Sequence, residues 1–476
     1  MNPLDARGFD SQRGKGKSTH FVGIGGTGLS AIARVLLERG EAVSGSDRED
    51  SPMMNSLRQA GAQVHIGHSA GNVNGAVRVI RSSAVTDDNV EVQAARAKGI
   101  PVLKRSEFLG ELLADQKVVA VAGSHGKTTT TAMLAWTLTA LNQKPGYIIG
   151  STAANLGANA AAGAGRLFVI EADEYDYMFL GLQPQIALVT NVEHDHPDLF
   201  PTPRDFQLAF ERFADRLHPD GILVACDHDK GATELLAYAR SMGRQTRAYS
   251  QTHPGKDYWM EDLRPPENGC YSFLAMRGGE RLAHVKLSVP GYHNALNALG
   301  ALAVADLLGL SVKEAAMALS DFRGTARRFE ERGEACGVFI VDDYAHHPTE
   351  IRNALAAAKA RYPKRRIVAV WQPHTFSRTL ALQADFFKAF RQADRVFVTD
   401  VYASREEPPT GFDMAQLAQS INHPNVLFVG DLEAAQQQLK KELTAGDLLL
   451  VMSAGDAIRL SEQLFKSLNE KEENHA

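Results

Sequence analysis

The chain has 476 residues, of which 44% are hydrophobic and 22% are charged, and its formal net charge is −5. This composition is typical of a globular protein with several domains of ~100 to 200 residues each, and it argues against a general nucleic-acid or membrane-surface binder. The widely spaced Cys226, Cys270 and Cys336 exclude a disulfide framework, and no run reaches the ~18 apolar residues of a membrane span, so we expect a cytoplasmic protein without membrane insertion.

The first predicted unit begins at His20 and alternates strands with helices. Its strands and their turns read HFVGIGG, EAVSGSD, QVHIGH, VRVIRSSAV and PVLK, with helices after the first turn and over residues 90–98. Apolar strands alternating with amphipathic helices predict a parallel sheet covered by helices on both faces. A polar segment over residues 106–117 is expected to lead out of this unit.

The turn after the first strand has the pattern G-x-G-x-x-G, formed by Gly23, Gly25 and Gly28, and Asp47 ends the next strand. In this position the backbone N–H groups and the helix N-terminus can bind a pyrophosphate. Taken alone, the pattern indicates NAD, and a tight turn without a ligand is the alternative.

The second predicted unit opens with VVAVAGSHGKTTTT over residues 118–131, a strand that runs through a glycine turn into a helix. The loop resembles a phosphate-binding loop but is shorter than G-x-x-x-x-G-K-[ST]. Lys127 would lie in the first helical turn, where a cation is disfavoured unless an anion lies in front of it. A phosphate supplies that anion, and Thr128 is then placed to bind Mg²⁺.

Two acidic clusters follow later strands of this unit. Residues 171–174 read EADE after LFVI, and residues 191–198 read NVEHDHPD after IALVT. Oxygen-rich side chains beside a phosphate loop favour Mg²⁺. Zinc bound by His194 and His196 is the rival interpretation, and solvated charged loops are another.

The remaining polar clusters follow the later strands. Asn294 and Asn297 lie at the start of an alanine-rich helix, where they could also be simple caps. A third unit starts near Arg327 with strands in VFIVDDYAHHP, RIVAVWQPH, RVFVTDVYA, NVLFVGD and DLLLVMSAGD. Its arginines at strand ends suit carboxylate or phosphate recognition, because the planar guanidinium binds such groups with two hydrogen bonds.

In this order the segments resemble the Mur ligase family, the amino-acid ligases of peptidoglycan precursor synthesis. The short loop of that family is G-T-x-G-K-T, and AGSHGKT matches it with Ser124 in place of threonine. Further similar segments are VGIGGTGLSAIA, EADEYDYMFL, VTNVEHDHPD, PGYHNALNAL, YAHHPTEI and WQPHTFSRT, so the resemblance extends from His20 to Leu460.

The resemblance implies an α/β fold of three domains. These are a Rossmann-like N-terminal domain over residues 1–114 that binds a UDP-sugar, a central P-loop ATPase-like domain over 115–325 that binds ATP, and a C-terminal Rossmann-like α/β domain over 326–476 that binds an amino acid. The implied activity joins L-alanine to the lactyl carboxylate of UDP-N-acetylmuramate, with ATP and Mg²⁺ as cofactors, in a monomer or homodimer. The G-x-G-x-x-G turn would then hold UDP instead of NAD.

The resemblance also assigns residues to each ligand. The UDP-sugar residues are Gly23, Gly25, Gly26, Thr27, Gly28, Ser46, Asp47 and Ser83. The ATP residues are Gly123, Ser124, His125, Gly126, Lys127, Thr128, Thr129, Asn294, Asn297, Arg328 and Asp343. The metal ligands are Thr128, Glu171 and His196, the amino-acid residues are His374 and Arg378, and the catalytic residues are Lys127, His196, His346 and Arg378.

The chemistry that these groups support is phosphoryl transfer from ATP to the lactyl carboxylate, because a free carboxylate is a poor electrophile. The amine of L-alanine then attacks the acyl phosphate and phosphate leaves through a tetrahedral intermediate. Catalysis is mainly positioning and charge neutralisation. His196 or His346 is a candidate for removing a proton from the amine.

The sequence also departs from the family. No lysine lies between Lys144 and Lys230, so the carbamylated lysine that some members use is absent. The segment YASREEPP places Arg405 where related members commonly have glycine, which is expected to narrow or recharge the amino-acid pocket. Three alternative functions are a ligase that attaches a recycled tripeptide to the same nucleotide sugar, an NAD-dependent oxidoreductase and a non-catalytic nucleotide switch.

Overall fold

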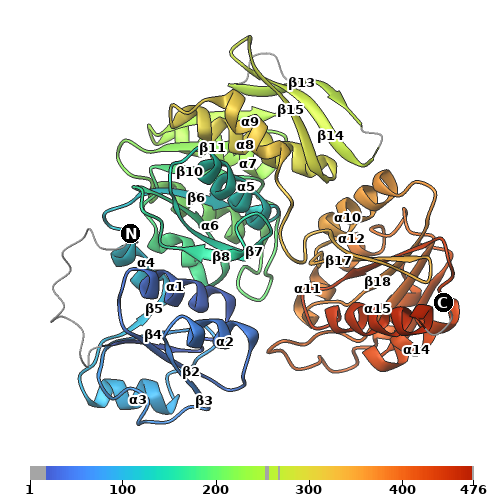
Figure 1. The fold of residues 1–476 in the computed structure, drawn as a ribbon, viewed down its shortest axis with the longest axis horizontal. Coiled ribbons are helices and arrows are strands. Elements are labelled where there is room, and N and C mark those ends of the chain that lie inside the picture. Colours follow the sequence, from blue (N-terminus) through green and yellow to red (C-terminus); the bar gives the residue numbers. More distant parts are fainter. Residues whose placement is uncertain (1–17, 252–256, 266–267, 474–476) are drawn as a thin grey trace.

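Three β-sheets with flanking helices follow one another along the chain in the computed structural model, which describes residues 18–251, 257–265 and 268–473 (Figure 1). The expected α/β class with three domains is confirmed. Each sheet lies within one of the three expected domains, whose exact boundaries stay predictions. Within the described residues, every helix is too short or too polar to cross a membrane.

The first domain is built on a parallel sheet. Its elements are β1 (Ser18–Val22), α1 (Thr27–Glu38), β2 (Val43–Asp47), α2 (Pro52–Gln59), β3 (Gln63–Ile66), β4 (Ala76–Arg81), α3 (Val90–Ala97) and β5 (Val102–Lys104). The strand order is β3-β2-β1-β4-β5. The order reverses between β1 and β4, and the turn after β1 therefore lies at the point where open α/β sheets bind ligands.

Helix α4 (Arg105–Leu112) joins the first domain to the second. The segment over residues 106–117 leads from the first unit to the second as expected, but residues 106–112 are helical, which the sequence pattern did not predict. Phe108, Leu109 and Leu112 are buried, and their spacing places them on one helical face. That face packs against the 3₁₀ helix η1 (Tyr175–Gly181) of the second domain.

The second domain has a sheet of ten strands in the order β15-β14-β13-β12-β11-β10-β6-β9-β7-β8. The strands are β6 (Lys117–Ala122), β7 (Gly146–Ala153), β8 (Ala158–Ala161), β9 (Leu167–Glu171), β10 (Ile186–Val189), β11 (Ile222–Cys226), β12 (Gln245–Ser250), β13 (Tyr258–Arg264), β14 (Cys270–Arg277) and β15 (Glu280–Pro290). The helices are α5 (Lys127–Ala140), α6 (Pro203–Asp215), α7 (Lys230–Ser241), α8 (Tyr292–Leu307) and α9 (Val312–Ser320). Antiparallel pairing occurs at both edges, in β7–β8 and in β13–β14–β15.

The register of the central strands determines which loops meet. Strand β6 pairs in parallel with β9 and β10, with Val121 opposite Glu171 and Ala122 opposite Val189. The carboxyl ends of these three strands therefore lie side by side. As a result, the phosphate loop after β6 is flanked by the two acidic clusters that the sequence analysis identified.

The third domain has a sheet of six strands in the order β16-β17-β21-β18-β19-β20, in which only β16 is antiparallel to its neighbour. The strands are β16 (Glu330–Ala335), β17 (Val338–Asp343), β18 (Arg366–Trp371), β19 (Arg395–Thr399), β20 (Val426–Gly430) and β21 (Asp447–Met452). The helices are α10 (Pro348–Arg361), α11 (Phe376–Ala381), α12 (Gln383–Phe386), α13 (Met414–Gln419), α14 (Leu432–Glu442) and α15 (Ile458–Glu473). Met452 pairs with Asp343 on one side and Trp371 on the other, which brings the loops after these strands together.

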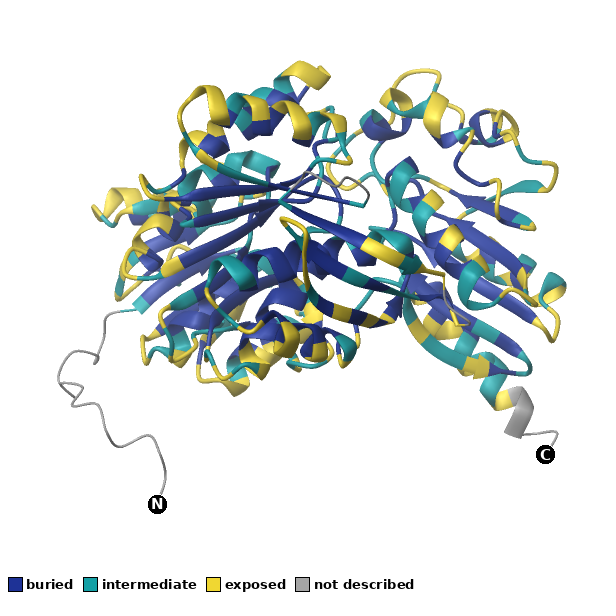
Figure 2. Ribbon diagram, turned by 90° about the horizontal axis from the view of Figure 1, so that it is seen from above, coloured by how far each residue is buried: buried dark blue, intermediate teal, exposed yellow. Residues whose placement is uncertain are grey.

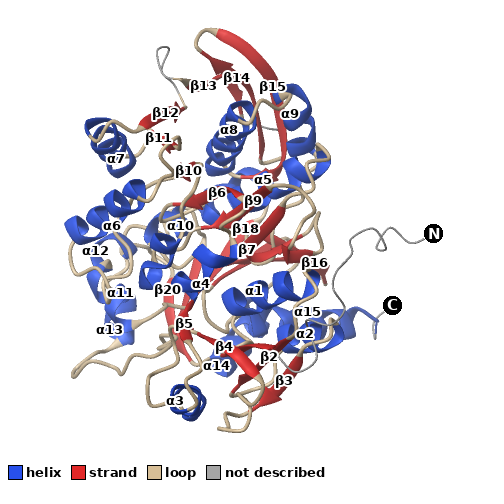
Figure 3. Cartoon of the chain, turned by 90° about the vertical axis from the view of Figure 1, so that its left-hand side faces the viewer, coloured by secondary structure: helices blue, strands red, loops and turns tan. Residues whose placement is uncertain are grey.

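The third domain lies beside the other two, and its helix α10 meets strand β15 and helix α8 of the second domain (Figures 1 and 3). Buried residues follow the sheets of the domains, whereas exposed residues lie on the outer helices and loops (Figure 2). Residues that follow strands of the second and third domains therefore face each other across the boundary between them.

An aromatic cluster of Phe179, Phe210 and Phe213 packs helix α6, which follows the second acidic cluster, against η1. The ring of Phe179 in η1 stacks on Phe213 at 4.8 Å and meets Phe210 edge-on at 5.4 Å, and all three side chains are fully buried. Phe210 and Phe213 lie one turn apart on α6, so a single helical face carries both rings.

We expect Phe210→Ala to lower the free energy of unfolding by about 3 to 5 kcal/mol, because it removes a buried ring and leaves a cavity. Urea unfolding followed by circular dichroism measures the change. Met317→Ala is the control, since Met317 is 65% exposed and its truncation should have an effect within about 0.5 kcal/mol. Equal midpoints for both variants would contradict the packing described for this cluster.

Candidate active site between the second and third domains

The phosphate loop requires glycine at two positions. Gly123 has a φ of +131°, and a Cβ there would lie 2.1 Å from the Thr190 hydroxyl oxygen. Gly126 has a φ of +81°, and a Cβ there would lie 2.8 Å from an amide oxygen of Asn297. Both contacts are too close for any side chain. The loop can therefore pack against the strand ends and against helix α8 at the same time.

Lys127 begins helix α5 and turns back into its own loop. Its Nζ donates to the carbonyl oxygens of Gly123 at 2.6 Å and Ser124 at 3.2 Å, and to Glu174 at 2.9 Å. Burial lowers the pKa of Lys127, but Glu174 and nearby carboxylates outweigh that effect and raise it. The ammonium group is therefore held as a cation at the centre of the loop.

Thr128 and Glu171, two of the three expected metal ligands, are in direct contact. The Thr128 hydroxyl donates to the Glu171 carboxylate at 2.8 Å, and the backbone N–H of Gly150 donates to the same carboxylate at 2.6 Å. Burial raises the pKa of Glu171, although Lys127 opposes the shift. A hydroxyl and a buried carboxylate beside the phosphate loop fit Mg²⁺, because a hard cation prefers oxygen ligands and would stabilise the charged carboxylate.

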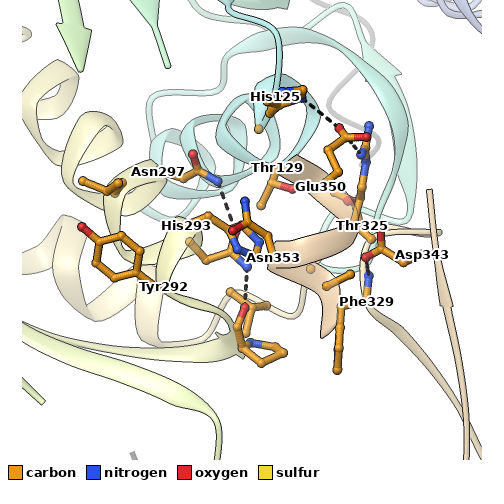
Figure 4. A pocket seen from close by; sticks show the side chains of 18 of the residues that line it. His125, Thr129, Tyr292, His293, Asn297, Thr325, Phe329, Asp343, Glu350 and Asn353 are labelled. Atoms are coloured by element: carbon orange, nitrogen blue, oxygen red, sulfur yellow. Dashed lines mark hydrogen bonds and ion pairs between the residues drawn. The ribbon is translucent and has the colours of Figure 1, made fainter. Parts of the chain in front are cut away.

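A cavity of about 770 Å³ lies between the second and third domains. It brings together most of the predicted ATP residues: His125, Gly126, Thr129, Asn294, Asn297, Arg328 and Asp343. Figure 4 shows Tyr292, His293 and Asn297 of helix α8 on one side and Phe329, Asp343 and Glu350 of the third domain on the other. A volume of this size suits a nucleotide-sized ligand.

Asp343 organises the third-domain wall of this cavity. Its two oxygens accept hydrogen bonds from the backbone N–H groups of Phe329 at 2.8 Å and Ala345 at 2.7 Å. Burial raises the pKa of Asp343 to about 6, although the Arg328 guanidinium opposes this shift. The Arg328 guanidinium forms an ion pair with Glu350 at 3.5 Å and lies over the ring of Tyr344, 4.8 Å from its centroid. These two contacts hold the guanidinium in place.

A second cavity of about 340 Å³ adjoins the first, and the two share Gly126, Arg328 and Glu350. It brings together the predicted catalytic and amino-acid residues and two of the three predicted metal ligands: Lys127, Glu171, His196, His346, His374 and Arg378. The phosphate loop therefore lies at the junction of a large and a small chamber.

Arg378 links the third domain to the second acidic cluster. Its Nε donates to Asp195 at 2.7 Å, its Nη1 to His374 Nδ1 at 2.9 Å and its Nη2 to His196 Nδ1 at 3.2 Å. Burial raises the pKa of Asp195, but the Arg378 guanidinium holds it well below its usual range. Burial also lowers the pKa of His374 to about 3, so this ring is neutral and accepts the hydrogen bond.

The phosphate loop itself contacts the third domain through His125. Its Nε2 lies 3.1 Å from Glu193 and its Nδ1 lies 3.4 Å from Glu350, while its ring centroid lies 4.5 Å from that of His347. Thr349 also donates to Glu193 at 2.8 Å. Burial lowers the pKa of His125, but the two carboxylates outweigh this effect and raise it to about 9.

The glycine turn of the first domain is braced by two charged side chains. Asp47 accepts a hydrogen bond from the Gly25 backbone N–H at 2.8 Å. Arg105 lies over the start of α1, where a Cβ on Gly28 would meet its Nη1 at 2.3 Å. Arg105 also pairs with Asp173 at 3.3 Å. A guanidinium over a helix N-terminus suits an anionic ligand such as a pyrophosphate.

The structure separates the two serines that were expected at the UDP-sugar site. Ser46 is fully buried behind the turn, and its hydroxyl donates to the buried Glu91 at 2.5 Å. Ser83 lies at the boundary with the second domain and donates to Asp176 at 2.7 Å. Ser46 is thus placed to support the neighbouring Asp47, whereas Ser83 faces the second domain.

Four residues that the sequence analysis did not assign have central places: Arg105, Glu174, Asp195 and Glu350. Glu174 and Asp195 lie in the acidic clusters, so that signal was present in the sequence. Glu350 lies one helical turn after His346, and the two side chains approach to 3.1 Å. No pattern in the sequence singles out Arg105, because its partners are distant along the chain.

Two chambers that meet at one phosphate loop suit an enzyme that uses a nucleotide in the first chamber to activate a substrate in the second. This arrangement fits an ATP-dependent ligase. Comparison with known families supports this class, since three family descriptions match along the chain: "Mur ligase family, catalytic domain" over residues 18–117, "Mur ligase middle domain" over 121–305 and "Mur ligase, glutamate ligase domain" over 327–455.

Individual relatives match over most of their length. A Renibacterium salmoninarum protein named "UDP-N-acetylmuramate--L-alanine ligase" is 42% identical over 94% of this chain and 95% of its own. The UDP-N-acetylmuramate-alanine ligase structure from Thermotoga maritima has a TM-score of 0.81 at 30% identity and covers 95% of this chain and 99% of its own. A murein peptide ligase from Psychrobacter arcticus has a TM-score of 0.72 at 26% identity, with coverages of 95% and 98%. The chain belongs to the Mur ligase family, which confirms the resemblance seen in the sequence.

The raised pKa of His125 predicts a pH-dependent contact between domains. An unfolded histidine has a pKa of about 6.5, so the stabilisation from protonated His125 is fully present below that pH and is lost as the pH rises through about 9. We expect His125→Gln, which cannot be protonated, to lack this loss between pH 6.5 and 9.5. Urea unfolding midpoints across that range measure the difference.

His65→Gln is the matched control, because His65 is exposed on strand β3. Its midpoint should follow that of the wild type at every pH. Parallel curves for the wild type and His125→Gln would show that the charge on His125 does not contribute to the contact.

Proposed function

We propose that this enzyme joins L-alanine to the lactyl carboxylate of UDP-N-acetylmuramate, with ATP converted to ADP and phosphate, in peptidoglycan precursor synthesis. The observation that carries the proposal is the meeting of the nucleotide chamber and the smaller chamber at Gly126 of the phosphate loop, next to Lys127, which lines the smaller chamber. A relative of that name with 42% identity over nearly the whole chain supports the choice of substrates. We expect the protein to act in the cytoplasm as a monomer or homodimer.

ATP would occupy the larger chamber with its phosphates at the loop. Asn294 and Asn297 on helix α8 are placed for the adenine, and Arg328 and Asp343 would complete the pocket from the third domain. Gly123, Ser124, His125, Gly126 and Thr129 would surround the phosphates. Lys127 would contact the β- and γ-phosphates, since its ammonium group already lies inside the loop.

Mg²⁺ would be held by Thr128 and Glu171, and it would neutralise charge on the transferred phosphoryl group. His196 is the proposed ligand of a second Mg²⁺. In the structure, Arg378 donates to its Nδ1, so the proton of the neutral ring is on Nε2, 3.5 Å from Glu174. Metal binding at Nε2 would therefore require the ring proton to move to Nδ1, which Arg378 would have to release.

The UDP part of the sugar nucleotide would bind the glycine turn at Gly23, Gly25, Gly26, Thr27 and Gly28, with Arg105 as an additional partner for the pyrophosphate. Asp47 and Ser46 would support the turn, and Ser83 would contact the ligand near the second domain. Membership of the Mur ligase family favours this interpretation over NAD binding. The lactyl carboxylate would then extend towards Lys127.

The incoming amino acid would lie in the smaller chamber near His374 and Arg378. Of the two candidate bases, His346 is better suited. Its Nδ1 donates to the Tyr344 carbonyl at 3.0 Å, which leaves Nε2 of the neutral ring as a proton acceptor. His196 donates through Nε2 towards Glu174 in the same arrangement and is less available.

A peptide ligase is the second candidate, because a murein peptide ligase structure also covers 95% of this chain. Release of phosphate from ATP with UDP-N-acetylmuramate and each of the common amino acids, or with the tripeptide L-alanyl-γ-D-glutamyl-meso-diaminopimelate, separates the two candidates. We expect L-alanine to give the fastest turnover. Turnover with the tripeptide alone would replace our proposal by the second candidate.

We expect Lys127→Ala to lower kcat at least 100-fold, the usual effect of removing a preorganised donor to developing charge. Binding of UDP-N-acetylmuramate, measured by calorimetry, should be nearly unchanged, because we propose that the glycine turn and Arg105, and not Lys127, hold the UDP part of this ligand. Lys313→Ala is the control, since Lys313 is exposed on helix α9 and does not line either chamber. A Lys127→Ala enzyme with wild-type turnover would refute the assignment of the phosphate loop.

A further inference from the structure

The smaller chamber contains one basic side chain whose charge is not balanced. Four lysine and arginine residues line this chamber, all of them within the described residues. Three are paired with carboxylates: Lys127 with Glu174 at 2.9 Å, Arg328 with Glu350 at 3.5 Å and Arg378 with Asp195 at 2.7 Å. The fourth, Arg405, is exposed, and its guanidinium has no carboxylate within 4.0 Å among the residues that the structure describes.

The backbone around Arg405 is fixed to the start of helix α11. The N–H of Tyr402 donates to the Pro373 carbonyl at 2.8 Å, and the Tyr402 carbonyl accepts from the N–H of Thr375 at 3.0 Å. On the other side of Arg405, Glu406 accepts hydrogen bonds from the backbone N–H of Ser377 at 2.8 Å and from the Ser377 hydroxyl. Arg405 is therefore presented by a braced loop, next to the helix that carries Arg378.

The opposite wall of the chamber belongs to the second domain and carries an acidic group. The Tyr175 hydroxyl donates to Asp198 at 3.2 Å, and the Tyr175 ring lies 5.0 Å from that of His196. Tyr175, Asp198 and Arg405 all line the smaller chamber. The mouth of the chamber thus has a positive charge on one domain and a negative charge on the other.

We propose that Arg405 binds the α-carboxylate of the incoming amino acid and thereby selects a free amino acid over the N-terminal residue of a peptide. This proposal rests on the proposed function. A free amino acid is a zwitterion, so its carboxylate matches Arg405 and its ammonium group matches the acidic wall at Asp198. Arg378 can still donate hydrogen bonds to the substrate, but Asp195 already balances its charge.

The same charge explains selection against peptides. The first residue of a peptide has its carboxyl group in an amide bond, which carries no charge. Such a substrate would place an uncharged carbonyl against Arg405 and lose a charge-assisted hydrogen bond. In this chain, the unbalanced cation at position 405 would therefore favour a single amino acid over a peptide.

The test compares L-alanine with L-alaninamide, which keeps the attacking amine but lacks the carboxylate. We expect Arg405→Ala to lower kcat/KM for L-alanine about 10- to 100-fold, the range for losing a hydrogen bond to a charged group, and to change that for L-alaninamide less than 2-fold. The preference of the enzyme for L-alanine therefore falls by the same factor. The KM values for ATP and UDP-N-acetylmuramate should stay unchanged.

Two further variants sharpen the comparison. Arg405→Lys keeps the charge without the two-donor geometry and should restore part of the preference for L-alanine. Arg391→Ala removes an exposed arginine of the same domain that lines neither chamber, and it should behave as the wild type with both substrates. We also expect Arg405→Ala to narrow the difference between L-alanine and the tripeptide L-alanyl-γ-D-glutamyl-meso-diaminopimelate.

Equal losses for L-alanine and L-alaninamide would overturn the proposal, because they would assign Arg405 a structural role. A raised KM for ATP or for UDP-N-acetylmuramate in Arg405→Ala would also overturn it, since the guanidinium would then bind a phosphate. Both results require a wild-type enzyme that is active with L-alanine. A wild type that releases no phosphate with L-alanine would instead refute the proposed function, and the role of Arg405 with it.

Discussion

The buried ion pair between Arg378 and Asp195 is the interaction on which the geometry of the site depends. Each side chain comes from a different domain, and both are almost fully buried. Burying either charge without its partner would destabilise the protein, commonly by about 3 to 5 kcal/mol. The ion pair therefore favours the relative orientation of the second and third domains in which Arg378 and Asp195 meet. The same guanidinium holds the rings of His196 and His374, and one contact therefore aligns groups from both sides of the smaller chamber.

The cations around the phosphate loop are paired with carboxylates of the protein when no ligand is bound. Lys127 is matched by Glu174, and His125 is matched by Glu193 and Glu350. A bound nucleotide adds several negative charges to these groups, and Mg²⁺ at Thr128 and Glu171 would offset part of them. This pairing explains why acidic side chains lie beside a site for an anionic ligand, an arrangement that would otherwise be unfavourable.

Much of the fold followed from the sequence because short apolar strands alternate with amphipathic helices and end in polar clusters. The phosphate loop, the acidic clusters and the polar residues of helix α8 could be identified for the same reason, since each follows a strand or begins a helix. The antiparallel edges of the central sheet were not predicted, because apolar alternation does not reveal strand direction. Helix α4 was missed because its apolar face consists of only Phe108, Leu109 and Leu112 among charged residues. The burial of Ser46 and Arg378 and the position of Arg105 depend on partners far away in the chain, which a single sequence does not identify.

Arg105 is both the first residue of helix α4 and the side chain that covers the glycine turn of the first domain. Since α4 is the segment that joins the first and second domains, any rotation of one domain relative to the other must carry this guanidinium along with it. If the sugar nucleotide binds under Arg105 as proposed, its affinity would depend on the angle between the first and second domains. Binding of that ligand would then favour one orientation of these two domains.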